Sequence, residues 1–446
     1  MAMETGELTL KKTLWFFVPL ALSGIMMSAG EPIVHSGLAR LQRPELVLAA
    51  YGVSFYAAVL VEAPIIMLLP ASSTLVRDSA SYRLVRNAML IINLFLTAIM
   101  AVVVYHGPTY DFIFLGLMRY PPAVAEAART SLGLLLLWPA SIGVRRFCQG
   151  ILIRLGHPQV VGWGTLIRLI SMVVCVYIGV EYFPDLGVLI GAGTLIVGVL
   201  VEMTVAIWAL RRRFLRKPLP ASAPDTPAGA MSYRGFVRFY LPLALTSFAW
   251  VLARPLMLSG IARSHMANLS LAAFPVAMGS MQVLTGHLRM IQQVVVALVE
   301  DAHSLDTVRR FTLWVGAGLT GLLSLVAFTP LAILYHGGVI GLRSPTLEMA
   351  NVALGFMVLM PLLTALQAYN QGLMIRAEDT LGVNMAAFAN LGVLVLLLNV
   401  GVGATALPGY IIAACVLPAA LAFEVLILRR WTQGHVRVLR SPAPRP

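Results

Sequence analysis

Arginine and glutamine side chains recur at helical spacing inside stretches that are otherwise apolar. Arg145 and Gln149 are four residues apart, and Gln282, Thr285 and Arg289 fall on one face of a single predicted helix. Other polar residues at such spacing are Thr246, Trp250, Arg254, Gln292, Thr364, Gln367 and Gln371. A guanidinium group stays protonated and can donate two parallel hydrogen bonds to a carboxylate or a phosphate. These polar stripes therefore predict a site for an organic or phosphorylated anion.

We expect the anion to contact eight residues of these polar stripes, which lie in parts of the sequence that resemble one another. They are Arg145, Gln149, Arg254, Gln282, Thr285, Arg289, Gln367 and Gln371. Neighbouring helical residues point about 100° apart, so only one of Arg145 and Arg146 can face a cavity fully, and Arg145 shares a face with Gln149. The alternative is that the stripes only join helices through hydrogen bonds. Arg168 and Glu202 are expected near helix ends or paired between helices.

The composition indicates the kind of protein that carries these residues. Of 446 residues, 59% are hydrophobic and only 11% are charged, and the mean hydropathy is +0.86. A soluble protein could not bury so much apolar surface, whereas a helical membrane protein can. We predict an all-α integral membrane protein with twelve spans at 13–40, 46–71, 86–107, 124–155, 158–181, 186–213, 233–263, 267–299, 308–336, 346–375, 380–400 and 404–430.

Lysine and arginine residues fix the expected orientation. With a cytoplasmic N-terminus, most of them fall in inner segments, including Arg211–Arg213 and the C-terminal arginines. The outer side then holds only Arg40, Arg43, Arg119, Arg129, Arg263 and Arg343. This asymmetry predicts that both termini are cytoplasmic and that the protein lies in the inner (plasma) membrane. The net charge of +13 then reflects topology rather than nucleic-acid binding.

The sequence contains an internal repeat. The stretch 16–40, FFVPLALSGIMMSAGEPIVHSGLAR, returns at 239–263 as FYLPLALTSFAWVLARPLMLSGIAR, and FCQGILIR at 147–154 returns as YNQGLMIR at 369–376. Because six spans separate the copies, both copies enter the membrane from the same side. We therefore predict two parallel six-helix lobes, residues 1–213 and 233–432, with a cytoplasmic linker at 214–232 and a cytoplasmic tail at 433–446.

The repeat places a glutamate opposite an arginine. Glu31 in the first copy corresponds to Arg254 in the second, and a proline follows each of them. We predict that Glu31 and Arg254 pair as an outer gate, and that Glu31, His35 and Glu62 are candidates for gating or proton coupling. The alternative is that each charge pairs within its own lobe. Pro32 and Pro255 lack an amide hydrogen and are expected to bend their helices one turn earlier.

No pattern typical of an enzyme is present. The chain has no phosphate-binding G-x-x-x-x-G-K-[ST] loop and no H-E-x-x-H pattern, which argues against direct driving by ATP and against a zinc site. Cys148, Cys175 and Cys415 all lie in apolar segments, so we expect neither disulfides nor a metal centre. We predict no catalytic residue, no cofactor and no nucleic-acid partner.

Short motifs along the chain resemble the progressive ankylosis protein family, within the MATE-like flippase superfamily. They are Phe17-Val18-Pro19-Leu20, Gly30-Glu31 with Gly37, Ala50-Tyr51-Gly52, Gly150-Ile151-Leu152, Pro242-Leu243-Ala244-Leu245, Arg254-Pro255, Phe274-Pro275-Val276 and Leu284-Thr285. The resemblance implies a fold of two six-helix lobes and the export of citrate, nucleotide triphosphate or pyrophosphate. The sequence departs after Thr285, where Gly286 replaces the acidic residue that the family pattern leads one to expect.

We therefore predict an alternating-access secondary transporter that exports a small organic or phosphorylated anion. Its partners would be the anion, the lipid bilayer and a coupling proton or sodium ion. One alternative is a multidrug antiporter coupled to protons or sodium, in which acidic residues would dominate the cavity. The other is a flippase for a lipid-linked anionic saccharide, which needs a lateral opening and an apolar groove. The sequence leaves the substrate, the coupling ion and the oligomeric state open.

Overall fold

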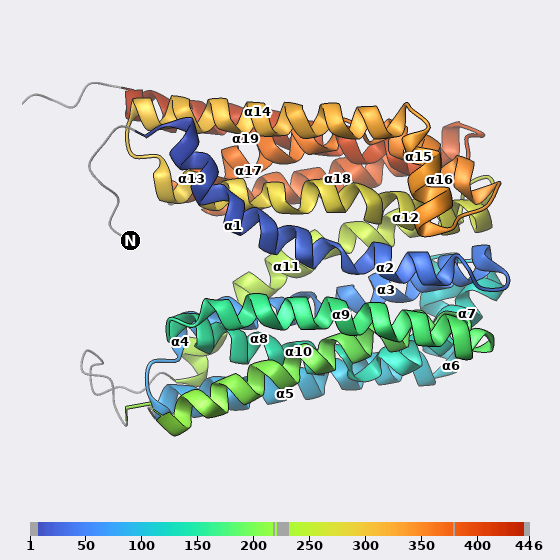
Figure 1. The fold of residues 1–446 in the computed structure, drawn as a ribbon, viewed down its shortest axis with the longest axis horizontal. Coiled ribbons are helices and arrows are strands. Elements are labelled where there is room, and N and C mark those ends of the chain that lie inside the picture. The colour runs from blue at the N-terminus through green and yellow to red at the C-terminus, as the bar shows by residue number, and fades with distance from the viewer. Residues whose placement is uncertain (1–7, 217–218, 221–231, 378–379, 441–446) are drawn as a thin grey trace, which may run out of the picture. The chain divides into compact units, whose positions relative to one another are not determined.

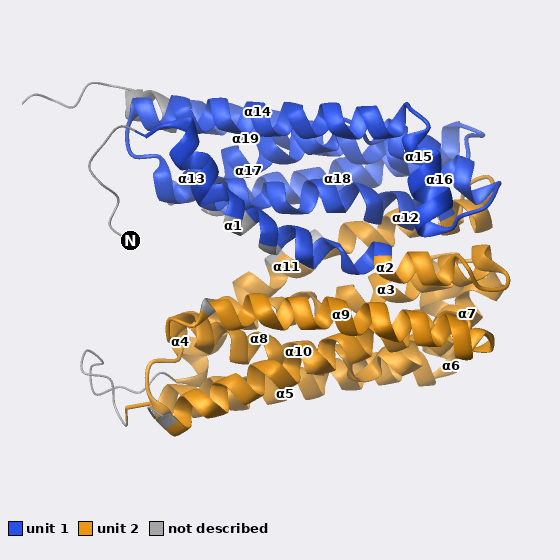
Figure 2. Ribbon diagram, in the orientation of Figure 1, with its two compact units in different colours: residues 1–32, 273–446 blue, residues 33–272 orange. Residues whose placement is uncertain are grey.

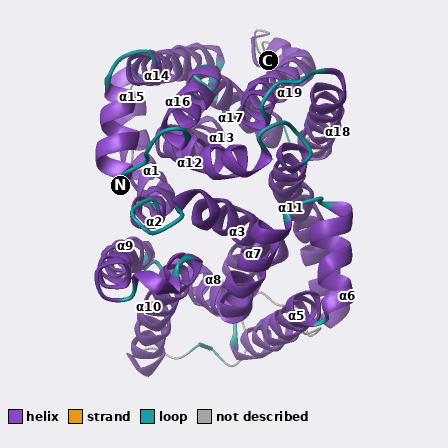
Figure 3. Cartoon of the chain, turned by 90° about the vertical axis from the view of Figure 1, so that its right-hand side faces the viewer, coloured by secondary structure: helices purple, strands orange, loops and turns teal. Residues whose placement is uncertain are grey.

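The computed structural model describes residues 8–216, 219–220, 232–377 and 380–440, and nearly all of them are helical (Figures 1 and 3). These residues contain no β-strand, so the predicted all-α fold is confirmed. The long helices are α1 (Leu10–Ser28), α3 (Pro44–Ile66), α5 (Ser79–Tyr105), α7 (Pro122–Leu134), α8 (Trp138–Arg154), α9 (Pro158–Tyr182), α10 (Val188–Arg216), α11 (Tyr233–Ala262), α12 (Ala267–Thr285), α14 (Ala302–Ala327), α16 (Thr346–Phe356), α17 (Met360–Arg376), α18 (Thr380–Ala404) and α19 (Gly409–Arg440). The short ones are α2 (Gly30–Leu38), α4 (Leu68–Leu75), α6 (Gly107–Tyr110), α13 (Ile291–Leu298) and α15 (Leu331–Ile333).

The described residues contain nine helices that are long and apolar enough to span a bilayer, or ten when the bent pair α16–α17 counts as one span. Ten of the twelve predicted spans correspond to these helices. The other two, at 13–40 and 233–263, correspond to α1–α2 and to α11. Most of the predicted linker, 214–232, and the end of the predicted tail lie outside the described residues.

Large apolar side chains on several helices point outward. Leu94 on α5 is 73% exposed and Trp314 on α14 is 74% exposed. In the most apolar window of α18 only 17% of the residues are buried, compared with 72% in the span that contains α12. Such contiguous apolar exposure is unfavourable in water but suits contact with lipid tails.

Several spans consist of two helices with a break between them, and prolines lie close to the breaks. α1 ends at Ser28 and α2 begins at Gly30, because Pro32 has no amide hydrogen to donate to the Ser28 carbonyl. α17 carries Pro361 in its first turn, after a 44° bend from α16. α11, in contrast, continues through Pro255 to Ala262. Missing amides therefore interrupt some spans and only perturb others.

Local structure repeats at the spacing that relates the sequence stretches 16–40 and 239–263. Asp78 caps α5, and Asp301, at the corresponding position of the second copy, caps α14. The Ser81 amide donates to Asp78 Oδ1 at 2.8 Å, and the Ser304 amide donates to Asp301 Oδ1 at 2.8 Å. Two π-helical segments, η1 (Asp111–Leu117) and η5 (Leu334–Ile340), correspond at the same spacing. The duplication seen in the sequence thus reappears as duplicated backbone structure.

The chain forms two compact units (Figure 2). Unit 1 contains residues 1–32 and 273–446, and unit 2 contains residues 33–272. In unit 1, α1 packs against α13, α14 and the 3₁₀ segment η4 (Gly286–Met290), with the Phe17 ring centroid 5.4 Å from that of Phe311. In unit 2, α11 packs against α3, α4 and α5.

The composition of the units differs from the predicted lobes, 1–213 and 233–432. The first helix of each sequence copy, α1 or α11, packs with the remaining helices of the other copy. The repeat in sequence marks where the chain was duplicated. It does not determine which helices share a hydrophobic core, because that depends on side-chain packing.

Candidate functional site

A buried carboxylate joins three helices of unit 2. Glu202, on α10, is only 2% exposed and accepts an ion-paired hydrogen bond on Oε2 from Arg145 of α8. Its other oxygen, Oε1, accepts hydrogen bonds from Gln149 Nε2 at 3.0 Å and from Thr165 Oγ1 of α9 at 3.2 Å. Arg168 Nε, also on α9, lies 3.5 Å from Glu202 Oε2. Arg168 and Glu202 therefore form one of the two arrangements expected of them, a pair between helices.

A second glutamate and a third arginine belong to the same electrostatic cluster. Glu62, on α3, is buried and interacts electrostatically with Arg146, Arg145 and Arg168. Three arginines and two glutamates give the cluster a formal charge of +1. Buried charges are costly unless they are compensated, so a surplus positive charge at this depth favours an additional anion. We call Glu62, Arg145, Arg146, Arg168 and Glu202, with Gln149 and Thr165, the arginine cluster.

Not all polar atoms of the arginine cluster are satisfied. Within the described part of the chain, Arg145 Nε, Arg146 Nε and Gln149 Oε1 are buried and have no hydrogen-bond partner. Most buried polar groups in folded proteins do have a partner. The free Nε donors belong to charged guanidinium groups, whose hydrogen bonds to anionic oxygens are the strong, short kind.

The other sequence copy contains the same carboxylate without the arginines. Glu424 on α19 accepts a hydrogen bond from Gln371 Nε2 of α17 at 3.1 Å, and another from Asn390 of α18. At the spacing that relates the stretches 147–154 and 369–376, Glu424 corresponds to Glu202. The same spacing pairs Gln371 with Gln149, Asn390 with Arg168, Gln367 with Arg145 and Ala368 with Arg146. The fold therefore tolerates neutral residues at all three arginine positions, so the positive charge is not a requirement of the packing.

The predicted stripe Gln282–Gln292 does not form one helical face. α12 ends at Thr285, and the 3₁₀ segment η4 follows before α13 begins at Ile291. A 3₁₀ segment has about three residues per turn, so it shifts Arg289 out of the 3.6-residue register. Thr285 is buried and donates to the Met281 carbonyl, Gln282 is half-buried, and Arg289 is exposed in unit 1. The spacing argument was wrong here because it assumed an unbroken helix.

The remaining predicted binding residues lie on α11 and α17, helices that carry no residue of the arginine cluster. Gln367 and Gln371 are half-buried on α17 in unit 1. Arg254 lies on α11 in unit 2, and its guanidinium is 5.3 Å from the centroid of the Tyr56 ring. The following residue, Pro255, accepts a hydrogen bond from the Tyr120 hydroxyl at 3.4 Å. Arg254 therefore makes a cation–π contact within its own unit.

The candidate gating residues are distributed over both units. Glu31 and Pro32 belong to unit 1, whereas His35 and Arg254 belong to unit 2. His35 is buried, with its ring edge-on to Tyr51 at a centroid distance of 5.6 Å. The pairing of Glu31 with Arg254 stays a prediction.

Sequence reasoning placed Arg168 and Glu202 outside the candidate site, although they belong to its centre. The signal was present, because Glu202 and Glu424 have the same separation in sequence as Gln149 and Gln371. Two acid–amide pairs that recur at one spacing indicate a side-chain contact that both copies keep. Single charged residues in apolar helices give no such indication of their partners.

No protein-family model matches the chain, and no curated protein matches its sequence. Solved structures do match its fold. An inward-facing multidrug resistance transporter of the MATE family in the MOP superfamily has a TM-score of 0.75 and 16% identity, over 95% of this chain and 99% of that one. The inward closed form of the lipid II flippase MurJ has a TM-score of 0.69 and 12% identity, over 94% and 87%.

A third similar structure comes from Pyrococcus furiosus. It is a MOP superfamily transporter described as having a binding pocket of reverse polarity, which suggests a different function for that protein. Its TM-score is 0.64 at 15% identity, over 99% of this chain and 100% of that one. The chain therefore has the fold of MATE and other MOP superfamily transporters. At these identities the similarity is one of fold, and the function has to be argued from the site.

Proposed function

We propose that this protein is a secondary transporter that moves a small organic or phosphorylated anion across the membrane by alternating access. The observation that carries the proposal is the arginine cluster, a buried group of three guanidiniums and two carboxylates. Its surplus positive charge and its free Nε donors suit a carboxylate or phosphate ligand. The fold supports transport as the general class of activity.

Arg146 is the proposed primary contact of the anion. Arg145 is engaged by the Glu202 carboxylate, and Arg168 lies beside the same group. Arg146 has neither contact, and among the described residues its Nε has no hydrogen-bond partner. The sequence pattern predicted Arg145 as the contact, whereas the contact proposed here is its neighbour Arg146. The reason is that sharing a helical face with Gln149 directs Arg145 toward Glu202.

The other predicted contacts remain part of the proposal. Arg254, Gln282, Thr285, Arg289, Gln367 and Gln371 are candidates for binding the anion at other stages of the transport cycle. The resemblance to the progressive ankylosis family suggests citrate, pyrophosphate or a nucleoside triphosphate as substrate. We further propose an inner-membrane location with both termini cytoplasmic, which rests on the distribution of lysine and arginine.

The test is flux in proteoliposomes that contain the purified full-length protein. Labelled citrate, pyrophosphate and ATP are supplied separately, with a cationic dye as the probe for the multidrug alternative. The decisive variant combines Arg145→Gln, Arg146→Ala and Arg168→Asn, which gives the cluster the residues of the other copy. Because that copy folds with those residues, we expect normal expression and thermal stability together with loss of anion flux.

Arg86→Gln is the matched control, because it removes an exposed arginine from α5. We expect it to transport at the rate of the unaltered protein. Anion flux that persists in the triple variant would overturn the site. Transport of the dye, with no flux of any anion, would favour a multidrug antiporter. Movement of a lipid-linked saccharide alone would favour a flippase.

A further inference from the structure

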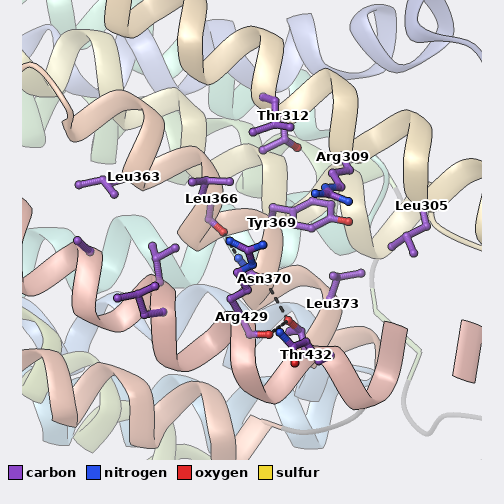
Figure 4. A pocket seen from close by; sticks show the side chains of 15 residues that line it. Leu305, Arg309, Thr312, Leu363, Leu366, Tyr369, Asn370, Leu373, Arg429 and Thr432 are labelled. Carbon is purple, nitrogen blue, oxygen red and sulfur yellow. Dashed lines mark hydrogen bonds between the residues drawn. The ribbon is translucent and has the colours of Figure 1, made fainter. Parts of the chain in front are cut away.

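A pocket lies within unit 1, between α14, α17 and α19 (Figure 4). Its volume is about 510 Å³. All of its lining residues belong to these three helices, and none belongs to the arginine cluster. Leu426 and Leu313, two of the lining residues, are 59% and 39% exposed, so the pocket reaches the outer surface of the unit. The pocket is not part of the proposed anion site.

The lining changes in character along the pocket. Leucine side chains, among them Leu305, Leu363 and Leu366, form much of its wall. Two arginines, Arg309 of α14 and Arg429 of α19, contribute the positive charge. In Figure 4, Arg309 lies beside the Tyr369 ring and Arg429 lies close to Asn370. The pocket therefore offers both an apolar surface and a pair of cations.

The two arginines are available to a ligand, whereas the neutral polar groups beside them are already bonded. Thr432 Oγ1 donates to Asn370 Oδ1 at 3.1 Å, and Asn370 Nδ2 donates to the Leu366 carbonyl at 2.7 Å. Within the described part of the chain, neither Arg309 nor Arg429 takes part in an ion pair. Both side chains are exposed, so their positive charges are not neutralised by packing within the unit and can interact with a ligand.

The first sequence copy has an aromatic residue at the position that Leu305 occupies in the second. Tyr82 corresponds to Leu305 at the spacing that relates the stretches 16–40 and 239–263. The Tyr82 ring is 5.5 Å from Phe147 and 5.5 Å from Phe214, measured between centroids. Arg86 corresponds to Arg309 at the same spacing, but Ile207 stands at the position of Arg429 when 147–154 is aligned with 369–376. An arginine at the position of Arg429 is thus particular to the second copy, whereas the first copy has Arg211 at the position of Gln433.

We propose that this pocket binds an anionic phospholipid of the inner leaflet. One acyl chain lies along the leucine wall, and the headgroup phosphate accepts hydrogen bonds from Arg309 and Arg429. Basic pockets between transmembrane helices on the cytoplasmic side suit anionic lipid headgroups, and the predicted orientation places both arginines on that side. A soluble anion would use the arginines but leave the leucines and the lateral opening without a role.

Native mass spectrometry of the detergent-solubilised full-length protein tests this proposal. The protein is titrated with phosphatidylglycerol and with phosphatidylcholine of identical acyl chains, and with glycerol phosphate as a soluble probe. We expect at least fivefold greater retention of phosphatidylglycerol than of phosphatidylcholine, and no retention of glycerol phosphate. The double variant Arg309→Gln/Arg429→Gln should reduce phosphatidylglycerol retention to the level of phosphatidylcholine.

Two further variants separate the pocket from general surface charge. Leu305→Tyr places the residue of the other copy in the pocket, and should lower retention of phosphatidylglycerol while leaving both arginines in place. Arg86→Gln removes the equivalent arginine of the other copy and should change nothing. Each of three results would overturn the proposal: equal retention of the two lipids, retention of glycerol phosphate equal to that of phosphatidylglycerol, or an effect of Arg86→Gln as large as that of the double variant.

Discussion

Glu202 and Glu424 are equivalent residues in the two copies of the repeat, and each carboxylate accepts a hydrogen bond from the equivalent glutamine. The partners otherwise differ. Glu202 also binds Arg145 and lies beside Arg168, whereas Glu424 binds the Asn390 amide. Duplication has therefore kept the carboxylate that joins the helices and has let the charge around it diverge. A functional site in only one copy requires that the charged residues differ between the copies while the helix packing stays the same.

The two glutamates should differ in their importance for stability. Glu202→Gln leaves two buried guanidiniums without their carboxylate, and removal of one partner of a buried ion pair costs about 3–5 kcal/mol. Glu424→Gln breaks only hydrogen bonds with neutral amides. Such bonds to a charged group contribute about 1.5–3 kcal/mol each. The new glutamine amide can restore part of this hydrogen bonding. Thermal unfolding in detergent should therefore show a larger loss for Glu202→Gln. An equal loss would contradict the charge argument.

Much of the fold could be predicted because its determinants are local. Runs of apolar residues fix the spans. The chain reads VRD at 76–78 and VED at 299–301, and the last residues of these two triplets, Asp78 and Asp301, are equivalent helix caps in the structure. The breaks in the helices were harder to predict. Pro32 marks one of them, whereas Pro255 lies within an unbroken helix, since the cost of a missing amide can be met by neighbouring groups.

The candidate site was predicted only in part, because contacts between helices are not local. Arg145 and Gln149 were identified from their spacing, but their partner Glu202 lies on a different helix, far along the sequence. Arg289 was grouped with Gln282 on a helical face that the 3₁₀ segment η4 interrupts. Periodicity identifies a polar face but not the group that faces it.

Two equivalent glycines should not tolerate a side chain. A Cβ atom at Gly150 would lie 2.4 Å from the Leu69 carbonyl oxygen and 2.0 Å from Ser72 Oγ, and at Gly372 it would lie 2.7 Å from Val295 Cβ. Gly150→Ala should lower the free energy of unfolding by about 1–3 kcal/mol, because the backbone carbonyl cannot move aside without separating α4 from α8. Gly162 has open space around it, so Gly162→Ala serves as the control. Similar unfolding temperatures for the two variants would refute the close packing.

The cap of α14 should make a pH-dependent contribution to stability. Hydrogen bonds from the Ser304 amide and hydroxyl lower the pKa of the Asp301 carboxyl below its usual value. A lowered pKa in the folded state means that the stabilisation is present above the usual carboxyl pKa and is lost as the pH falls through the lowered value. Asp301→Asn should therefore flatten the acid side of the stability profile. Asp306→Asn, which lies outside the cap, is the comparison; identical profiles for both variants would argue against the assignment.

Removal of the Glu62 carboxylate should tighten anion binding and slow transport. Glu62→Gln leaves Glu202 as the only carboxylate of the arginine cluster, so three arginines then face one glutamate. If the anion binds at Arg146, its affinity should increase about tenfold, equivalent to about 1.4 kcal/mol. Tighter binding slows release of the anion from the bound state. With release as the slow step of the cycle, the maximal flux should fall and the KM should fall with it.

Glu126→Gln removes the same charge from an exposed position on α7 and should leave both kinetic quantities unchanged. The measurement is initial flux into proteoliposomes over a range of anion concentrations, repeated at several pH values. Because Glu62 is also the candidate for proton coupling, the flux of Glu62→Gln should lose any pH dependence that the unaltered protein shows. A KM that rises in Glu62→Gln would mean that Glu62 assists the anion rather than competing with it for Arg146, and the proposed geometry of the site would be wrong.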